Sequence, residues 1–191
     1  MQPDRFLRAV VFLIVLVGVL RIPVAAGPPQ VAPVSPESAA FREFTQRVQQ
    51  YVKLYKTVPR LRTTKQPKEI VERRKARAQE IRETRSNAKP GDIFTPEVSE
   101  EFRRVIRSTF QGANARNVRR TIREGVPLAA VHLSVNADYP DRLPLTTVPP
   151  TLLLRLPRLP AEVAYRIIGH DFVLQDTQAK LIVDFILGVV P

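Results

Sequence analysis

"YRIIGHDFVLQDTQAKLIVDF", residues 165–185, combines β-forming side chains with two turn signals within 21 residues. Residues 162–168 and 172–175 are rich in β-forming side chains. Between them, Gly169-His170 has the form of a two-residue hairpin turn with glycine in the first position. The stretch therefore predicts two antiparallel strands joined by a tight turn.

A third strand is expected at 180–186, after a second turn at 176–179. Alternate side chains of a strand point to the same face, so we expect one face of it to carry Leu181, Val183 and Phe185. A three-stranded meander needs a helix across one face to be stable. The sequence therefore predicts an α+β fold, with amphipathic helices packed on a small C-terminal antiparallel meander.

Two upstream segments have the apolar spacing of helices that could cover this sheet. Residues 38–57 place aromatic and aliphatic side chains three and four positions apart, and Ser35 or Ser38 is placed to cap the start. Residues 95–111 show the same spacing, and Thr95 is their N-cap candidate. Both helices are expected to contribute one face to the core.

The composition indicates a cationic protein. The chain has 191 residues, a formal net charge of +12 and no cysteine. The absence of cysteine excludes disulfides, thiolate metal sites and thiol catalysis. The positive charge favours anionic partners such as nucleic acid, anionic lipid or acidic polymer.

Two segments concentrate this charge. Residues 60–85 contain 10 Lys or Arg and 4 Glu, with Pro67 suited to a first helical turn. We expect a long solvated helix there, in which only four residues can face a core: Ile70, Val71, Ala78 and Ile81. Residues 114–125 are expected to form a short helix. Its basic stripe is the candidate anion-binding site: Arg116, Arg119, Arg120 and Arg123.

Guanidinium groups on one short helix can bind phosphates or carboxylates through two hydrogen bonds each. The alternative is that the stripe is an outward, solvated face opposite a buried one. The sequence leaves both interpretations open.

The N-terminus has the three parts of a secretory signal. Arg5 and Arg8 precede an apolar run at 9–20, and small residues follow up to Ala26. We expect residues 1–26 to be a signal peptide cleaved after Ala26. A retained anchor is the alternative, although 12 helical residues span about 18 Å against a hydrocarbon core of about 30 Å.

Residues 38–191 are expected to form one core after a linker. Residues 27–37 read as a Pro-rich linker and 38–125 as the helical basic region. Residues 126–191 combine a Pro-rich loop with the meander. Within them we expect a strand at 128–135 and one helical turn at 152–156, begun by two prolines.

Candidate catalytic residues are few. His132 and Ser134 would share one face of the expected strand, and His170 lies in the hairpin turn beside Asp171. No G-x-S-x-G motif accompanies them. A small periplasmic hydrolase therefore remains an alternative only, and we expect no cofactor and no metal site.

The tail "LPRLPAEVAYRIIGHDFVLQDTQAKLIVDFI" carries Pro157 and Pro160, then Tyr165, then a turn with Gly169 and Asp171. In this order it resembles the C-terminal hairpin repeat of the RcnB family of bacterial periplasmic proteins, which is linked to nickel and cobalt homeostasis. The resemblance implies a small periplasmic sheet and leaves an RcnB-like metal-stress protein as an alternative.

The complete chain also resembles a type of exported bacterial protein, through "KPGDIFTPEV" and "LPLTTVPPTLLLRLPRLP". That resemblance implies export without a particular activity. We therefore expect an exported, non-enzymatic protein in the periplasm or outside the cell. Its basic helix faces would bind an anionic polymer, a lipid surface or a protein of the envelope, and nucleic acid is not an expected partner after export.

Overall fold

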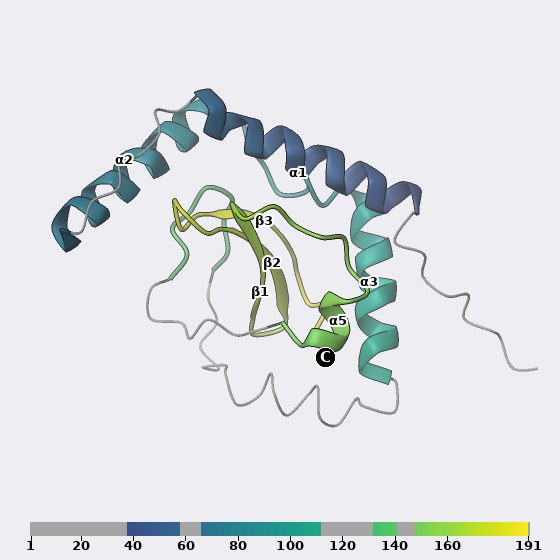
Figure 1. Cartoon of the computed structure of the whole chain (residues 1–191). Helices are drawn as coiled ribbons and strands as arrows, with labels where there is room; N and C mark the ends of the chain where they lie inside the picture. The colour runs from purple at the N-terminus through teal and green to yellow at the C-terminus, as the bar shows by residue number, and fades with distance from the viewer. Residues whose placement is uncertain (1–37, 58–65, 112–131, 141–147, 191) are drawn as a thin grey trace, which may run out of the picture. The chain divides into compact units, whose positions relative to one another are not determined.

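The computed structural model describes residues 38–57, 66–111, 132–140 and 148–190. All of them belong to one compact unit, Val34–Pro191. Along the chain the elements are α1 (Ala39–Thr57), α2 (Pro67–Thr84), α3 (Pro96–Gln111), α5 (Pro150–Leu153), β1 (Val163–Ile168), β2 (Asp171–Asp176) and β3 (Ile182–Ile186) (Figure 1).

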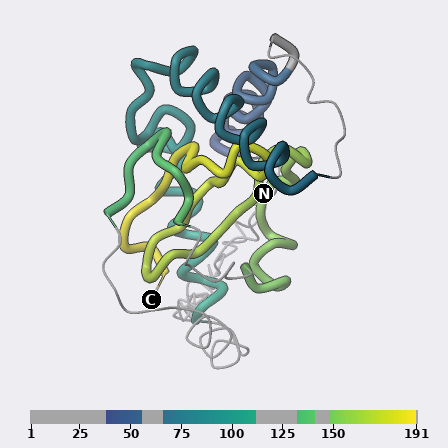
Figure 2. The backbone as a smooth tube through the Cα atoms, turned by 90° about the vertical axis from the view of Figure 1, so that its left-hand side faces the viewer, coloured from purple at the N-terminus to yellow at the C-terminus, as the bar shows by residue number. Residues whose placement is uncertain are grey.

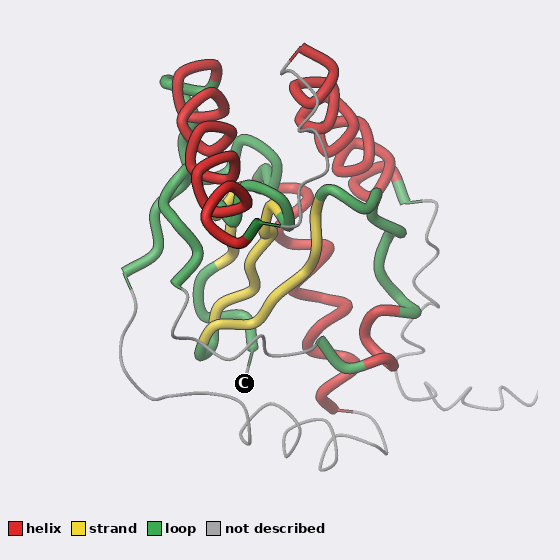
Figure 3. Tube along the Cα trace, turned by 60° about the vertical axis from the view of Figure 1, so that its left-hand side comes forward, coloured by secondary structure: helices red, strands yellow, loops and turns green. Residues whose placement is uncertain are grey.

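The three strands form an antiparallel sheet in the order β1-β2-β3 (Figure 3). Tyr165 lies opposite Leu174 in the first pair of strands. Gly169 has a φ of 59°, a conformation that glycine adopts without a steric penalty, and it allows the two-residue turn into β2. The α+β class and the C-terminal meander are therefore confirmed.

The expected helix starts are also confirmed. The backbone N–H of Phe41 donates to Ser38 Oγ at 3.2 Å, so Ser38 caps α1. The N–H of Val98 donates to Thr95 Oγ1 at 3.4 Å at the start of α3. Pro67 opens α2, where its missing N–H costs nothing.

Helices α1 and α3 cover one face of the sheet through a cluster of aromatic rings. The rings of Phe44 and Phe102 lie 4.9 Å apart between centroids. Those of Tyr165 and Phe172, on neighbouring strands, lie 5.3 Å apart, and Phe102 contacts both strands. All of these side chains are buried. Because large aromatic side chains bury the most apolar area, this cluster is the centre of the core.

The opposite face of the sheet carries a smaller apolar cluster, which includes Leu133, Tyr139 and Val173. The segment that contributes Leu133 runs beside β3 (Figure 2). It forms an isolated β-bridge between Asp138 and Leu181, and backbone hydrogen bonds join Asn136 and Ala137 to Ile182 at 2.8 and 2.9 Å. The strand expected at 128–135 is therefore wrong for its described part, since residues 132–135 have no strand structure.

A β-bulge in β3 corrects the expected faces of that strand. The register shifts so that Gln175 pairs with Ile182 and Leu174 pairs with Asp184, which leaves Val183 as the extra residue. Leu181 and Val183 belong to the main core, as expected, but Phe185 packs with the opposite cluster. Strict alternation fails because the bulge inserts one residue into the period of two.

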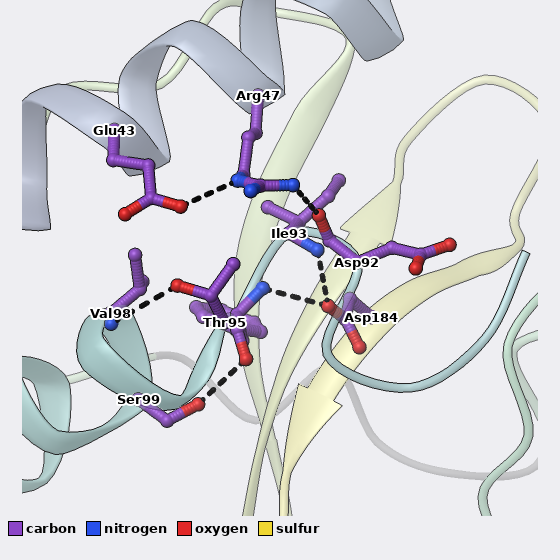
Figure 4. Close-up of polar contacts among 9 residues, drawn as sticks. Glu43, Arg47, Asp92, Ile93, Thr95, Val98, Ser99 and Asp184 are labelled. Atoms are coloured by element: carbon purple, nitrogen blue, oxygen red, sulfur yellow. Dashed lines mark hydrogen bonds and ion pairs between the residues drawn. The ribbon is translucent and has the colours of Figure 1, made fainter.

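The bulge places Asp184 on the helix-covered side, where its carboxylate is completely buried. Oδ2 accepts the backbone N–H groups of Ile93 and Phe94, both at 2.8 Å (Figure 4). Oδ1 accepts those of Gly91 at 3.0 Å and Phe185 at 2.9 Å. Arg47 of α1 donates to the carbonyl of Asp92 at 2.7 Å. Asp184 thus fixes the turn immediately before α3.

Replacing Asp184 by Ala should lower the free energy of unfolding by roughly 3–5 kcal/mol, because four backbone donors would lose a charged acceptor. Asp184→Asn keeps one oxygen acceptor and should cost less than the alanine variant. Urea unfolding followed by circular dichroism measures both. Equal, small losses in the two variants would contradict this role.

Candidate anion-binding cavity

The arginine stripe expected at 114–125, with Arg116, Arg119, Arg120 and Arg123, lies outside the described residues. Within the described chain, positive charge converges at a different place. A cavity of about 290 Å³ lies between α2, the segment 138–140 and the turn that joins β2 to β3. Four cationic side chains and one carboxylate are among its lining residues: Arg74, Lys75, Arg82, Lys180 and Asp138.

Helix α2 supplies three of the four cations because of their spacing. Arg74, Ala78 and Arg82 follow one another at intervals of four residues and therefore share a face of the helix, with Lys75 beside them. Ala78 and Ile81 are buried against the core, whereas Ile70 is 52% exposed. The second half of α2 therefore anchors the helix to the core. Its cationic side chains Arg74, Lys75 and Arg82 lie beside this buried contact and line the cavity.

Two hydrogen bonds orient Arg82. Its Nε donates to the carbonyl of Asn136 at 3.0 Å, and its Nη2 lies 2.8 Å from Asp138 Oδ1. Such an exposed ion pair adds little to stability. Arg85, one turn further on, exchanges side-chain and backbone hydrogen bonds with Asn136. The guanidinium of Arg82 is therefore set in one direction before any ligand arrives.

Lys180 contributes the fourth cation from a strained backbone. Its φ is 54°, in the left-handed region that costs a residue with a side chain about 1 kcal/mol or more. Its carbonyl accepts the N–H of Tyr139 at 2.7 Å, which holds this conformation. Glycine at this position would relieve the strain but would remove the cation from the cavity. Residues in strained backbone conformations are concentrated at functional sites, which is consistent with a binding role for Lys180.

A buried carboxylate holds the Lys180 turn against α1. Asp176 Oδ2 accepts hydrogen bonds from the hydroxyls of Tyr51 and Tyr55, both on α1. Its Oδ1 accepts the backbone N–H groups of Gln178 at 2.9 Å and Ala179 at 2.6 Å. These bonds fix the position of Ala179, the residue before Lys180. Ala179 and Lys180 therefore form a rigid wall of the cavity.

Stacked arginines link α2 to the same cluster. The guanidinium carbon of Arg77 lies 4.8 Å from the ring centroid of Tyr55, and that of Arg85 lies 5.0 Å from that of Tyr51. Cation–π contacts of this kind stabilise desolvated arginines. Burial lowers the pKa of Arg85. The two contacts add to the small apolar anchor of α2.

Two further cavities, of about 240 and 230 Å³, have fewer cations in their walls: Arg158 in the first, and Arg47 with Arg85 beside Asp92 in the second. The cavity at Lys180 is therefore the more cationic site. The many Lys and Arg residues of the 60–85 segment predict that α2 has basic faces. No local signal connected it with Lys180, which lies about a hundred residues further along the chain.

The candidate catalytic residues do not assemble in the described chain. His132 and Ser134 are both exposed. His170 Nδ1 lies 2.8 Å from the carbonyl of Val190, and Asp171 accepts the N–H of Gly188 at 2.8 Å. These contacts hold the C-terminal segment. Among the residues that the structure describes, no group of three His, Asp or Glu side chains could hold a metal ion.

Comparisons with protein-family models, with curated proteins and with solved structures find no match for this chain. In the described part of the chain, no helix combines the length and the apolar character required to cross a bilayer.

Every tyrosine of the chain has a raised pKa. Burial is the main cause for Tyr51, Tyr55, Tyr139 and Tyr165, and the charge of Asp176 adds to the increase for the first two. In the unfolded chain these groups ionise near pH 10. Above that pH the unfolded state loses protons that the folded state keeps, so stability should fall as the pH rises.

We therefore expect tyrosinate absorbance to appear together with the loss of circular dichroism in an alkaline titration. The chain has no tryptophan and four tyrosines, so the absorbance reports these groups alone. A gradual rise in tyrosinate absorbance near pH 10, with the folded circular dichroism intact, would contradict the buried tyrosine cluster.

Proposed function

We propose that this protein is an exported, non-enzymatic binding protein that holds an anionic component of the cell envelope through basic helix faces. The signal-like residues 1–26 support export, and the net charge of +12 supports an anionic partner. The observation that carries the proposal is the convergence of four cations from two separate parts of the fold on one cavity.

The geometry favours binding over catalysis. Arg74, Lys75 and Lys180 bring charge to the cavity, and no histidine lines it. Cationic side chains around a cavity can hold phosphate, sulfate or carboxylate groups through charge-assisted hydrogen bonds. We propose two contact surfaces: this face of α2, and the arginine stripe expected from the sequence at 116–123, which lies outside the described residues.

Chromatography on immobilised heparin, a sulfated polyanion, tests this surface. We expect the wild type to elute at high salt, because each cation that contacts the polyanion releases counterions on binding. A double variant of α2 and a quadruple variant of the stripe should elute much earlier: Arg74→Gln with Lys75→Gln, and Arg116→Gln, Arg119→Gln, Arg120→Gln with Arg123→Gln.

Charge-matched controls separate a site from simple net charge. Exposed cations on other parts of the fold can be replaced in equal number: Lys53→Gln with Lys89→Gln for the double variant, and both of these with Arg107→Gln and Arg158→Gln for the quadruple. Elution of each variant together with its control would rule out these helix faces as the contact surface. Elution of the wild type at low salt would overturn the proposal.

A further inference from the structure

Two aliphatic side chains are exposed beside the cationic cavity. Ile70 is 52% exposed and Val71 is 37% exposed. They precede Arg74 and Lys75 by four residues each, so each aliphatic residue shares a helix face with one cation. The first half of α2 therefore presents apolar and cationic side chains on the same side.

This combination distinguishes among anionic partners. A soluble polyanion would use the cations of the cavity and gain nothing from Ile70 or Val71. A membrane surface offers both a layer of phosphates and, beneath it, apolar acyl chains. Helices that lie in such an interface combine Lys and Arg with exposed aliphatic side chains that enter the boundary between headgroups and acyl chains.

The lengths of the side chains allow both contacts at once. An interfacial helix lies in the plane of the membrane, so side chains that share a face start at similar depths. Lys and Arg have long aliphatic stems and can keep their charged ends among the phosphates. The shorter side chains of Ile70 and Val71 then lie at the acyl boundary.

We propose that the first half of α2 and the cavity beside it bind a membrane surface that contains anionic phospholipid. A lipid phosphate occupies the cavity near Arg74, Lys75 and Lys180, and Ile70 and Val71 enter the acyl boundary. This inference rests on the proposed function, because both require an anionic partner at the basic faces. It narrows that partner to an anionic lipid surface.

The cavity supports a discrete phosphate contact in addition to diffuse attraction. Arg82 is already oriented by Asn136 and Asp138, and Lys180 is held at its positive φ by the hydrogen bond from Tyr139. A pre-oriented site loses less freedom when it binds. Lys180 should therefore matter more than an exposed lysine of equal charge elsewhere.

Cosedimentation with vesicles tests the inference. The chain from residue 27 onward is suitable, because it retains the whole compact unit Val34–Pro191 and omits the apolar run at 9–20. We expect binding to vesicles of phosphatidylcholine with phosphatidylglycerol, weak binding to phosphatidylcholine alone, and a decrease with salt. Lys180→Gln should weaken binding about fivefold or more, the effect of one Lys near an anionic surface, and Lys53→Gln should weaken it less.

The aliphatic pair has its own matched control. Ile70→Ser with Val71→Ser should reduce vesicle binding severalfold but leave elution from heparin unchanged. Leu153→Ser with Leu154→Ser removes two other exposed leucines, which are 42% and 85% exposed, and should leave both unchanged. Unchanged thermal unfolding shows that the variants remain folded.

The outcomes separate the two proposals. Retention on heparin without binding to anionic vesicles would overturn the lipid inference and leave the proposed function intact. Equal vesicle binding by the two aliphatic variants, or by the Lys180 and Lys53 variants, would also overturn it. If the wild type binds neither heparin nor anionic vesicles, both proposals are overturned.

Discussion

The buried carboxylate of Asp184 is the interaction on which the arrangement of this fold depends. A charge removed from water costs several kcal/mol unless hydrogen bonds replace its hydration. Here three backbone N–H groups of the 91–94 turn and that of Phe185 provide them. Since α3 begins at Pro96, directly after that turn, the same bonds determine where the helix starts on the sheet. The β3 bulge is what brings the carboxylate to this side.

A second buried carboxylate, Asp176, plays the corresponding part for α1 and for the turn before Lys180. Both carboxylates lie on sheet strands, and both accept hydrogen bonds from the elements that cover the sheet. The apolar core provides most of the stabilisation but little direction, whereas these bonds set the relative positions of helix and strand. The cavity at Lys180 exists because this second set of bonds holds its wall.

Local chemistry accounts for what the sequence predicted correctly. The hairpin at Gly169 and the caps at Ser38 and Thr95 depend on residues only a few positions apart. The helical turn expected at 152–156 is present but begins earlier, as α5 at Pro150–Leu153. The bulge could not be predicted, because it is stabilised by Asp184 contacts with residues about ninety positions away. For the same reason the candidate cavity was found only in part: α2 was recognisably basic, but Lys180 joins it through the tertiary fold.

The two halves of α2 differ in burial: the second half packs on the core, and the first half is largely exposed. The exposed half can therefore serve as a binding surface without weakening the core. Only Arg77, Ala78 and Ile81 of this helix are buried, so its contribution to stability lies in its second half. The cations and aliphatic side chains of its first half contribute little to folding, since exposed charges and exposed apolar residues gain little on folding. An exposed Ile70 and a strained Lys180 are therefore poorly explained by stability. The anionic lipid surface that we propose as partner would account for both, because it offers phosphates to the cation and acyl chains to the aliphatic side chain.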